Sequence, residues 1–136
     1  MDITVIIILA VIGLAILLAF FVMIKSSRKG LTETQQKYVR KHWNQIVDEV
    51  GSNPNLAIME ADKLLGYTLK AKGIEGSVGE QLKSTPSTFS DLNGIWTAHK
   101  LRNQIAHEIG MKISSDKAKS NLSIFKKALN DLGAKL

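Results

Sequence analysis

The pattern of apolar and polar positions divides the chain into two unlike parts. Residues Ile3 to Ile24 form an uncharged, apolar run of 22 residues that only Thr4 and Gly13 interrupt. As a helix rising about 1.5 Å per residue, this run would span about 33 Å, enough to cross the hydrocarbon core of a bilayer. We therefore predict a transmembrane anchor over residues 1–24.

The remaining residues repeat their apolar positions at intervals of three and four, which is typical of amphipathic helices. Capping and stop signals separate the helices: a capping box at Thr32–Gln35, Asn53 before Pro54, Gly73, and a serine at Ser77 and at Ser114 or Ser115. The predicted helices are residues 32–50, 53–73, 77–83, 90–109 and 114–132. No stretch alternates with period two and carries hairpin signals, so the predicted fold is all-α, with four main helices and one short segment.

Each main helix has an apolar stripe that predicts its buried face. The expected core positions are Val39, Trp43, Ile46 and Val50; Ala57, Ala61, Leu64, Leu65 and Leu69; Leu92, Ile95, Trp96, Ile105 and Ile109; and Ala118, Leu122, Phe125, Leu129 and Leu132. Four helices over about 106 residues can close one core without disulfides or metals.

The charges around the apolar run predict its orientation. Lys25, Arg28 and Lys29 follow it in a short basic linker, residues 25–30, whereas only Asp2 precedes it. Positive flanks stay in the cytoplasm, so we expect a single-pass plasma-membrane protein with its C-terminal domain cytoplasmic. The absence of cysteine agrees with this location. A cleaved signal peptide is the alternative, although it needs a positive N-terminal flank and a shorter apolar core.

The part after the anchor is basic. It holds all 18 Lys and Arg and, once Asp2 is set aside, 11 of the 12 Asp and Glu, which gives a net charge of +7. Such a charge attracts RNA phosphates. A domain held beside an anionic leaflet is expected to be basic as well, so both partners stay open.

The candidate chemistry lies in one segment, residues 96–108, with the sequence WTAHKLRNQIAHE. It places Arg102 five positions before His107. A guanidinium stays charged and binds phosphate oxygens as a planar fork, and an imidazole exchanges protons near neutral pH. Together they could act on a phosphodiester without a metal.

The stretch Arg102-Asn103-Gln104-Ile105-Ala106-His107 resembles the R-x(4 to 6)-H signature of HEPN domains, including the polar residue after the arginine. Residues 57–73 are similar to the helix that precedes the motif in small HEPN-like bacterial proteins, and the resemblance covers about residues 31–136. It implies a helical bundle that forms a homodimer with the motif at the interface. In many HEPN domains it implies a metal-independent ribonuclease; in others, a non-catalytic binding module.

Residues five apart on a helix differ by about 140° around its axis, so Arg102 and His107 of one chain do not share a face. The two residues could come together if the helix ends or bends near Ala106, or if two chains pair so that Arg102 of one complements His107 of the other. In the catalytic interpretation His107 is the general acid or base, Arg102 stabilises developing charge, and Asn103 orients a phosphate or holds the histidine. His99 and Glu108 are possible auxiliary residues. In the alternative, Arg102 pairs with Glu108 or with a helix-terminal carbonyl, and His107 caps the helix end. The domain is then a binding module or a plain membrane-tethered scaffold.

Other site classes are not expected. There is no cysteine, and the three histidines form no cluster with the spacing of metal ligands. The glycines at 73, 76 and 79 match no nucleotide-binding loop and are typical of a helix stop and a turn. We therefore predict no metal and no cofactor.

Overall fold

The structure, a computed structural model, describes residues 1–27 and 30–136, and their regular secondary structure is entirely helical. The all-α prediction is confirmed for these residues. The elements in chain order are α1 (Ile3–Ser27), α2 (Glu33–Glu49), α3 (Pro54–Ala71), α4 (Val78–Ser84), a 3-10 turn (Pro86–Thr88), α5 (Leu92–His107) and α6 (Ser115–Asp131).

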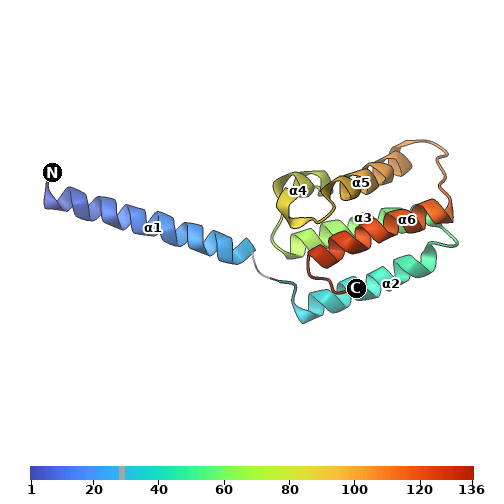
Figure 1. Cartoon of the computed structure of the whole chain (residues 1–136), viewed down its shortest axis with the longest axis horizontal. Coiled ribbons are helices and arrows are strands. Elements are labelled where there is room, and N and C mark those ends of the chain that lie inside the picture. Colours follow the sequence, from blue (N-terminus) through green and yellow to red (C-terminus); the bar gives the residue numbers. More distant parts are fainter. Residues whose placement is uncertain (28–29) are drawn as a thin grey trace.

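Helix α1 stands apart from the other helices (Figure 1). Its apolar span, Ile3–Ile24, is long and apolar enough to cross a membrane, and none of it is buried against the rest of the chain. The helix continues to Ser27, three residues beyond the predicted anchor. Of the predicted basic linker, Arg28 and Lys29 lie outside the described residues, and so does the side chain of Lys25.

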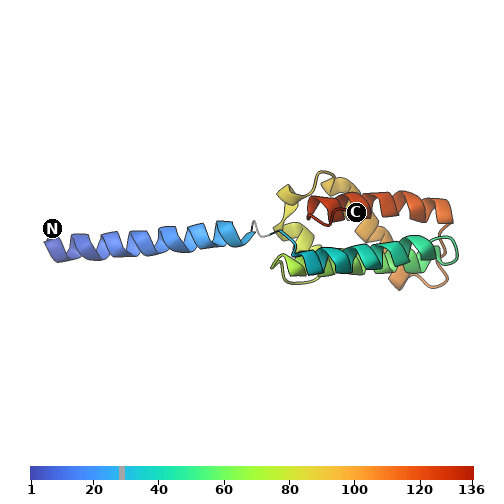
Figure 2. The ribbon, with the colours of Figure 1, turned by 90° about the horizontal axis from the view of Figure 1, so that it is seen from below.

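The other helices pack around α3, which contacts α2, α4, α5 and α6. Helices α2 and α3 lie side by side and run in opposite directions, joined by the short turn after Val50 (Figures 1 and 2). Helix α6 covers α3 and α5, and the short α4 lies at the start of α5. The central position of α3 gives its side chains access to two opposite faces of the bundle.

The helix starts follow the predicted capping signals. Thr32 and Gln35 form a complete capping box on α2, and Asn53, Ser77 and Ser114 each accept a hydrogen bond from the backbone N–H three residues later. These bonds satisfy amides that have no partner inside the helix. The polar side chains between the apolar stripes therefore fix where each helix begins.

The core contains the apolar stripes of all four main helices. Every predicted core position of α2, α3 and α6 is buried, from Val39 in α2 to Leu132 just after α6. In α5, Ile95 is fully buried, while Leu92, Trp96 and Ile105 are partly buried against the core. The predicted burial of Ile109 is wrong, because α5 ends before it reaches Ile109.

Candidate functional site

Helix α5 carries the R-x4-H motif, and both of its ends are defined by local chemistry. Asp91 caps the start, since its side chain accepts from the N–H of Gly94, so Asn93–Gly94 is accommodated in the first turn. The helix ends at His107, because Glu108 takes an extended conformation with ψ of 120°. Gly110, with φ of 74°, then turns the chain toward α6.

Arg102 belongs to a ring of four polar side chains, which we call the polar ring: Asp62, His99, Asn103 and Arg102. Arg102 Nη1 donates to Asn103 Oδ1 over 3.0 Å, and Arg102 Nε lies 3.5 Å from Asp62 Oδ2. His99 Nδ1 lies 2.8 Å from Asp62 Oδ1, and Asn103 Nδ2 lies 3.4 Å from His99 Nε2. The four side chains thus close a cycle that connects α3 to α5.

The donors and acceptors of the polar ring are consistent with one protonation state. If neutral His99 carries its proton on Nδ1, it donates to Asp62, and its Nε2 accepts from the Asn103 amide. The Asn103 oxygen then accepts from Arg102, whose positive charge faces the carboxylate. This tautomer is assigned from the hydrogen-bond pattern. Both nitrogens of His99 are engaged, so His99 acts as a structural link in the ring.

Burial strengthens the interactions of the polar ring. Asp62 is 3% exposed and His99 is 9% exposed, and the edge of Trp96 packs beside His99 with ring centroids 6.0 Å apart. A carboxylate so far from water needs compensating charge and hydrogen bonds, which His99 and Arg102 supply. The Arg102 side chain is 30% exposed, and among the described residues no group accepts a hydrogen bond from its Nη2. Arg102 is therefore held in place with donors left for an anion.

His107 does not join the polar ring. It is exposed in the last turn of α5, where the helix dipole favours a cation, and no hydrogen bond or ion pair connects it to another described residue. Helix α5 does end near Ala106, at His107, but this end does not bring His107 to Arg102: none of the hydrogen bonds or ion pairs of the described residues joins the two side chains. The two motif residues remain on different faces of the helix.

Asn103 and Glu108 take positions that only partly match their predicted roles. Asn103 does hold a histidine, but the histidine is His99 rather than His107. Glu108 is exposed, and among the described residues it forms no ion pair with Arg102, whose acidic neighbour is Asp62. The structure brings together Arg102, Asn103 and His99 and leaves His107 and Glu108 at the helix end.

Ile109 follows His107 by two residues and is fully exposed. The prediction that it continues the buried stripe of α5 assumed two more helical residues than the helix has. Because the chain leaves the helix at Glu108, Ile109 points into solvent instead of onto the core. An exposed isoleucine next to the motif histidine marks this end of α5 as a candidate contact surface.

Asp62 is the member of the polar ring that sequence reasoning missed. One signal was available: Asp62 lies four residues after Ile58 and three before Leu65, so it shares the helix face of two buried apolar side chains. A single carboxylate on such a face requires an internal partner. The partners, however, come from a helix more than thirty residues later.

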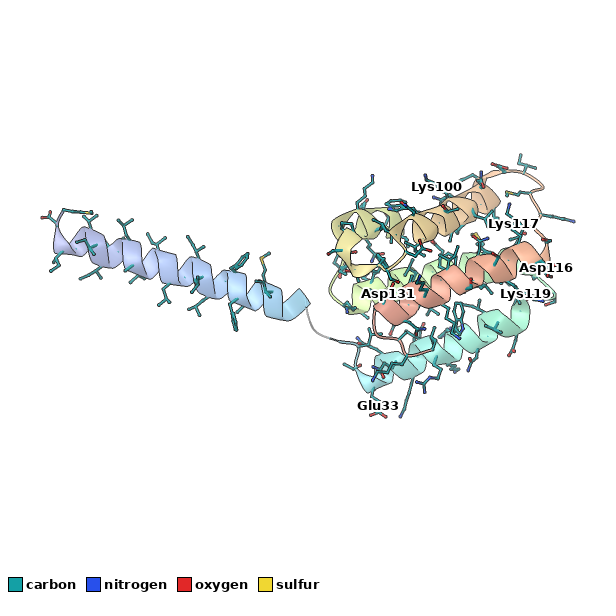
Figure 3. The ribbon with its side chains drawn as sticks, in the orientation of Figure 1. Glu33, Lys100, Asp116, Lys117, Lys119 and Asp131 are labelled. Atoms are coloured by element: carbon teal, nitrogen blue, oxygen red, sulfur yellow. The ribbon has the colours of Figure 1, made fainter. Side chains whose placement is uncertain are left out.

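Positive charge lies near the motif. Figure 3 shows Lys100 on the outer side of α5, and Lys117 and Lys119 in the first turns of α6, close to where the two helices are joined. All three are exposed. Among residues 1–27 and 30–136, no group of three or more His, Asp or Glu could hold a metal ion.

Comparisons with known proteins give this chain no relative. No family model, no curated protein and no solved structure matches it.

Proposed function

We propose that this protein is a membrane-anchored, HEPN-like RNA-binding module that cleaves RNA as a dimer. Arg102 of one chain and His107 of the other form the site. The observation that carries the proposal is the separation of the motif: Arg102 is fixed by the polar ring with free donors, while His107 is exposed on another face of α5. A second chain supplies the His107 that Arg102 cannot reach within its own chain.

The chemistry follows from the two side chains. His107 removes the proton from a ribose 2′-hydroxyl, and the 2′-oxygen attacks the adjacent phosphorus. The bond to the 5′-oxygen breaks, and that oxygen takes a proton from water. The Arg102 guanidinium stabilises the negative charge that develops on the phosphoryl oxygens. The products are a 2′,3′-cyclic phosphate and a 5′-hydroxyl.

Two surface features support a dimer that binds RNA. Ile109 is fully exposed beside His107 and gives the end of α5 an apolar contact for a partner. Lys100 on α5 and Lys117 and Lys119 at the start of α6 add exposed positive charge, which exceeds the one acidic side chain there, Asp116. Phosphate contacts from lysine supply most non-specific affinity for nucleic acid.

The membrane part of the proposal rests on α1. We propose that α1 remains as an uncleaved anchor, with the bundle on the cytoplasmic side, since three basic residues follow the span and one acidic residue precedes it. The full chain is then expected to stay in membranes after extraction with alkaline carbonate. Recovery of a shortened chain without α1 in the soluble fraction would show that the segment is a cleaved signal peptide.

A second candidate function is a non-catalytic interaction module, and one contact favours it. Asp62 compensates the charge of Arg102, so the polar ring carries no net charge when His99 is neutral. In that case the ring stabilises the bundle, and the exposed end of α5 only binds a partner.

The test is an RNA cleavage assay with the full chain in detergent micelles, in the presence of EDTA. We expect the wild type to cut a mixed RNA pool and leave cyclic-phosphate ends, and an Arg102→Ala, His107→Ala double variant to leave the pool intact. No cleavage by either protein, with RNA binding retained, would support the non-catalytic module. Equal cleavage by both would contradict the proposed site.

A further inference from the structure

A groove runs between α2 and α3, on the side of α3 away from the polar ring. It encloses about 450 Å³, and its floor includes the buried Ile46 and Leu64. Residues Glu60 and Asp62 differ by about 200° around α3, so the groove and the polar ring occupy opposite faces of that helix. The groove is therefore a separate surface from the one used in the proposed function.

The two ends of the groove differ in chemistry. At one end the rings of Tyr38, His42 and Tyr67 pack against one another at tilted angles, with centroids 4.2 Å apart for Tyr38 and His42 and 4.4 Å apart for Tyr38 and Tyr67. At the other end lie Glu49 of α2 and Leu56 of α3. Near the middle, Glu60 and Lys63 form an ion pair with Nζ 2.9 Å from Oε1.

The exposed apolar side chains of the bundle concentrate on this groove. Among the described residues after α1, five large apolar or aromatic side chains are exposed, and Tyr38, Leu56 and Tyr67 of these line the groove. They lie at both ends of it. A partner that covers the groove must therefore bury an aromatic end and an aliphatic end at once.

We propose that the groove is a self-association surface and that its occupant is the α2–α3 pair of a second copy of this chain. The helices of the two copies run antiparallel, related by a two-fold axis that crosses the groove at its middle. This contact goes beyond the proposed function, since it uses neither Arg102 nor His107.

Charge and shape complementarity favour this arrangement. A two-fold axis perpendicular to the helices places each residue of α3 opposite a residue of α3 in the second copy. The numbers of two such residues sum to about 123, so Glu60 faces the second copy's Lys63. The same axis sets Leu56 against the second copy's Tyr67. Each end of the groove thus meets the unlike end of the other copy, as an isologous interface requires.

The other two-fold arrangement is less favourable. An axis parallel to the helices would align the two copies in the same direction, so the end of the groove with Glu49 would meet the same acidic end of the other copy. Like charges that approach across an interface cost binding free energy. With both anchors in one membrane and the axis along its normal, the antiparallel pairing lays α2 and α3 along the membrane surface.

The experiment is disulfide cross-linking of the full chain in lipid vesicles. The chain has no cysteine, so a thiol introduced as Gln45→Cys is unique. Gln45 lies on the groove close to the axis, and two copies of it would be separated by about 4.5 Å along the helix direction. The matched control is Asn44→Cys. Asn44 is exposed on α2, and it lies about 100° around the helix axis from Gln45, outside the α2 residues that line the groove.

We expect mild oxidation to give several-fold more covalent dimer with Gln45→Cys than with Asn44→Cys. In the Gln45→Cys chain, the further substitution Glu60→Lys should reduce the yield of covalent dimer. A chain that also carries Lys63→Glu should recover this yield, because the exchanged charges pair again across the axis. An Arg102→Ala, His107→Ala background should leave the dimer unchanged, whatever RNA cleavage shows.

Three outcomes would overturn the proposal. The first is equal cross-linking at positions 44 and 45. The second is a cross-link that Glu60→Lys leaves unchanged, while circular dichroism shows the variant folded. The third is loss of the cross-link in the Arg102→Ala, His107→Ala background, while circular dichroism shows that this variant is folded as well. The last result would assign the contact to the motif interface instead.

Discussion

Replacement of His107 with alanine is expected to lower RNA cleavage about 10²- to 10⁴-fold, the usual contribution of a general acid or base. The free energy of unfolding should change by less than about 0.5 kcal/mol, as for other surface substitutions away from special features. The reason is that His107 is exposed in the last turn of α5 and contacts no other described polar group. Cleavage rates and urea unfolding of the same preparations in detergent measure the two effects.

Gln104→Ala provides the matched control for His107→Ala. Gln104 is exposed on the same helix between Arg102 and His107 and has no assigned role. Its replacement should leave both cleavage and stability near wild type. If Gln104→Ala and His107→Ala reduce cleavage equally, the effect belongs to the helix surface in general, and His107 is not the acid or base.

Replacement of Asp62 with alanine is expected to destabilise the bundle by about 3–5 kcal/mol, the cost of removing one partner from a buried ion pair. His99 Nδ1 donates to the Asp62 carboxylate, and Arg102 Nε lies 3.5 Å from it without a hydrogen bond. The substitution therefore leaves the His99 donor without an acceptor and the Arg102 guanidinium without its compensating charge. Asp62→Asn keeps an oxygen that can accept from His99 and should cost less. Urea unfolding followed by the fluorescence of Trp43 and Trp96 measures both variants.

Asp48→Ala is the control for Asp62→Ala, since Asp48 is an exposed acid on α2. It should leave the free energy of unfolding nearly unchanged. A loss of less than about 1 kcal/mol in Asp62→Ala would mean that the polar ring contributes no more than an ordinary hydrogen bond, and that Arg102 is not held by it.

Most of the helical architecture could be predicted from the sequence because its determinants are local. Capping residues and apolar spacing act within a few positions of the chain. The capping box at Thr32 predicts where α2 begins, and the apolar spacing predicts which residues of α6 are buried. The exception is the end of α5. There Glu108 becomes extended although the apolar spacing continues to Ile109, so periodicity alone placed the helix end two residues late.

The candidate site was less predictable because its contacts join distant parts of the chain. Arg102, Asn103 and His99 are neighbours on one helix face and could be grouped from spacing. Asp62 is 37 residues before His99, and only the packing of α3 against α5 shows that its carboxylate organises the other three. Whether His107 completes the site depends on a second chain, which spacing within one chain does not describe.

Complementation between two inactive variants tests whether each site is shared between two chains. Arg102→Ala chains and His107→Ala chains are mixed in detergent, allowed to exchange, and assayed for RNA cleavage in EDTA. If each site takes Arg102 from one chain and His107 from the other, a mixed dimer contains one intact site, and random pairing restores about a quarter of wild-type activity. A mixture as inactive as its separate components, while wild-type protein cuts under the same conditions, would contradict a site shared between chains.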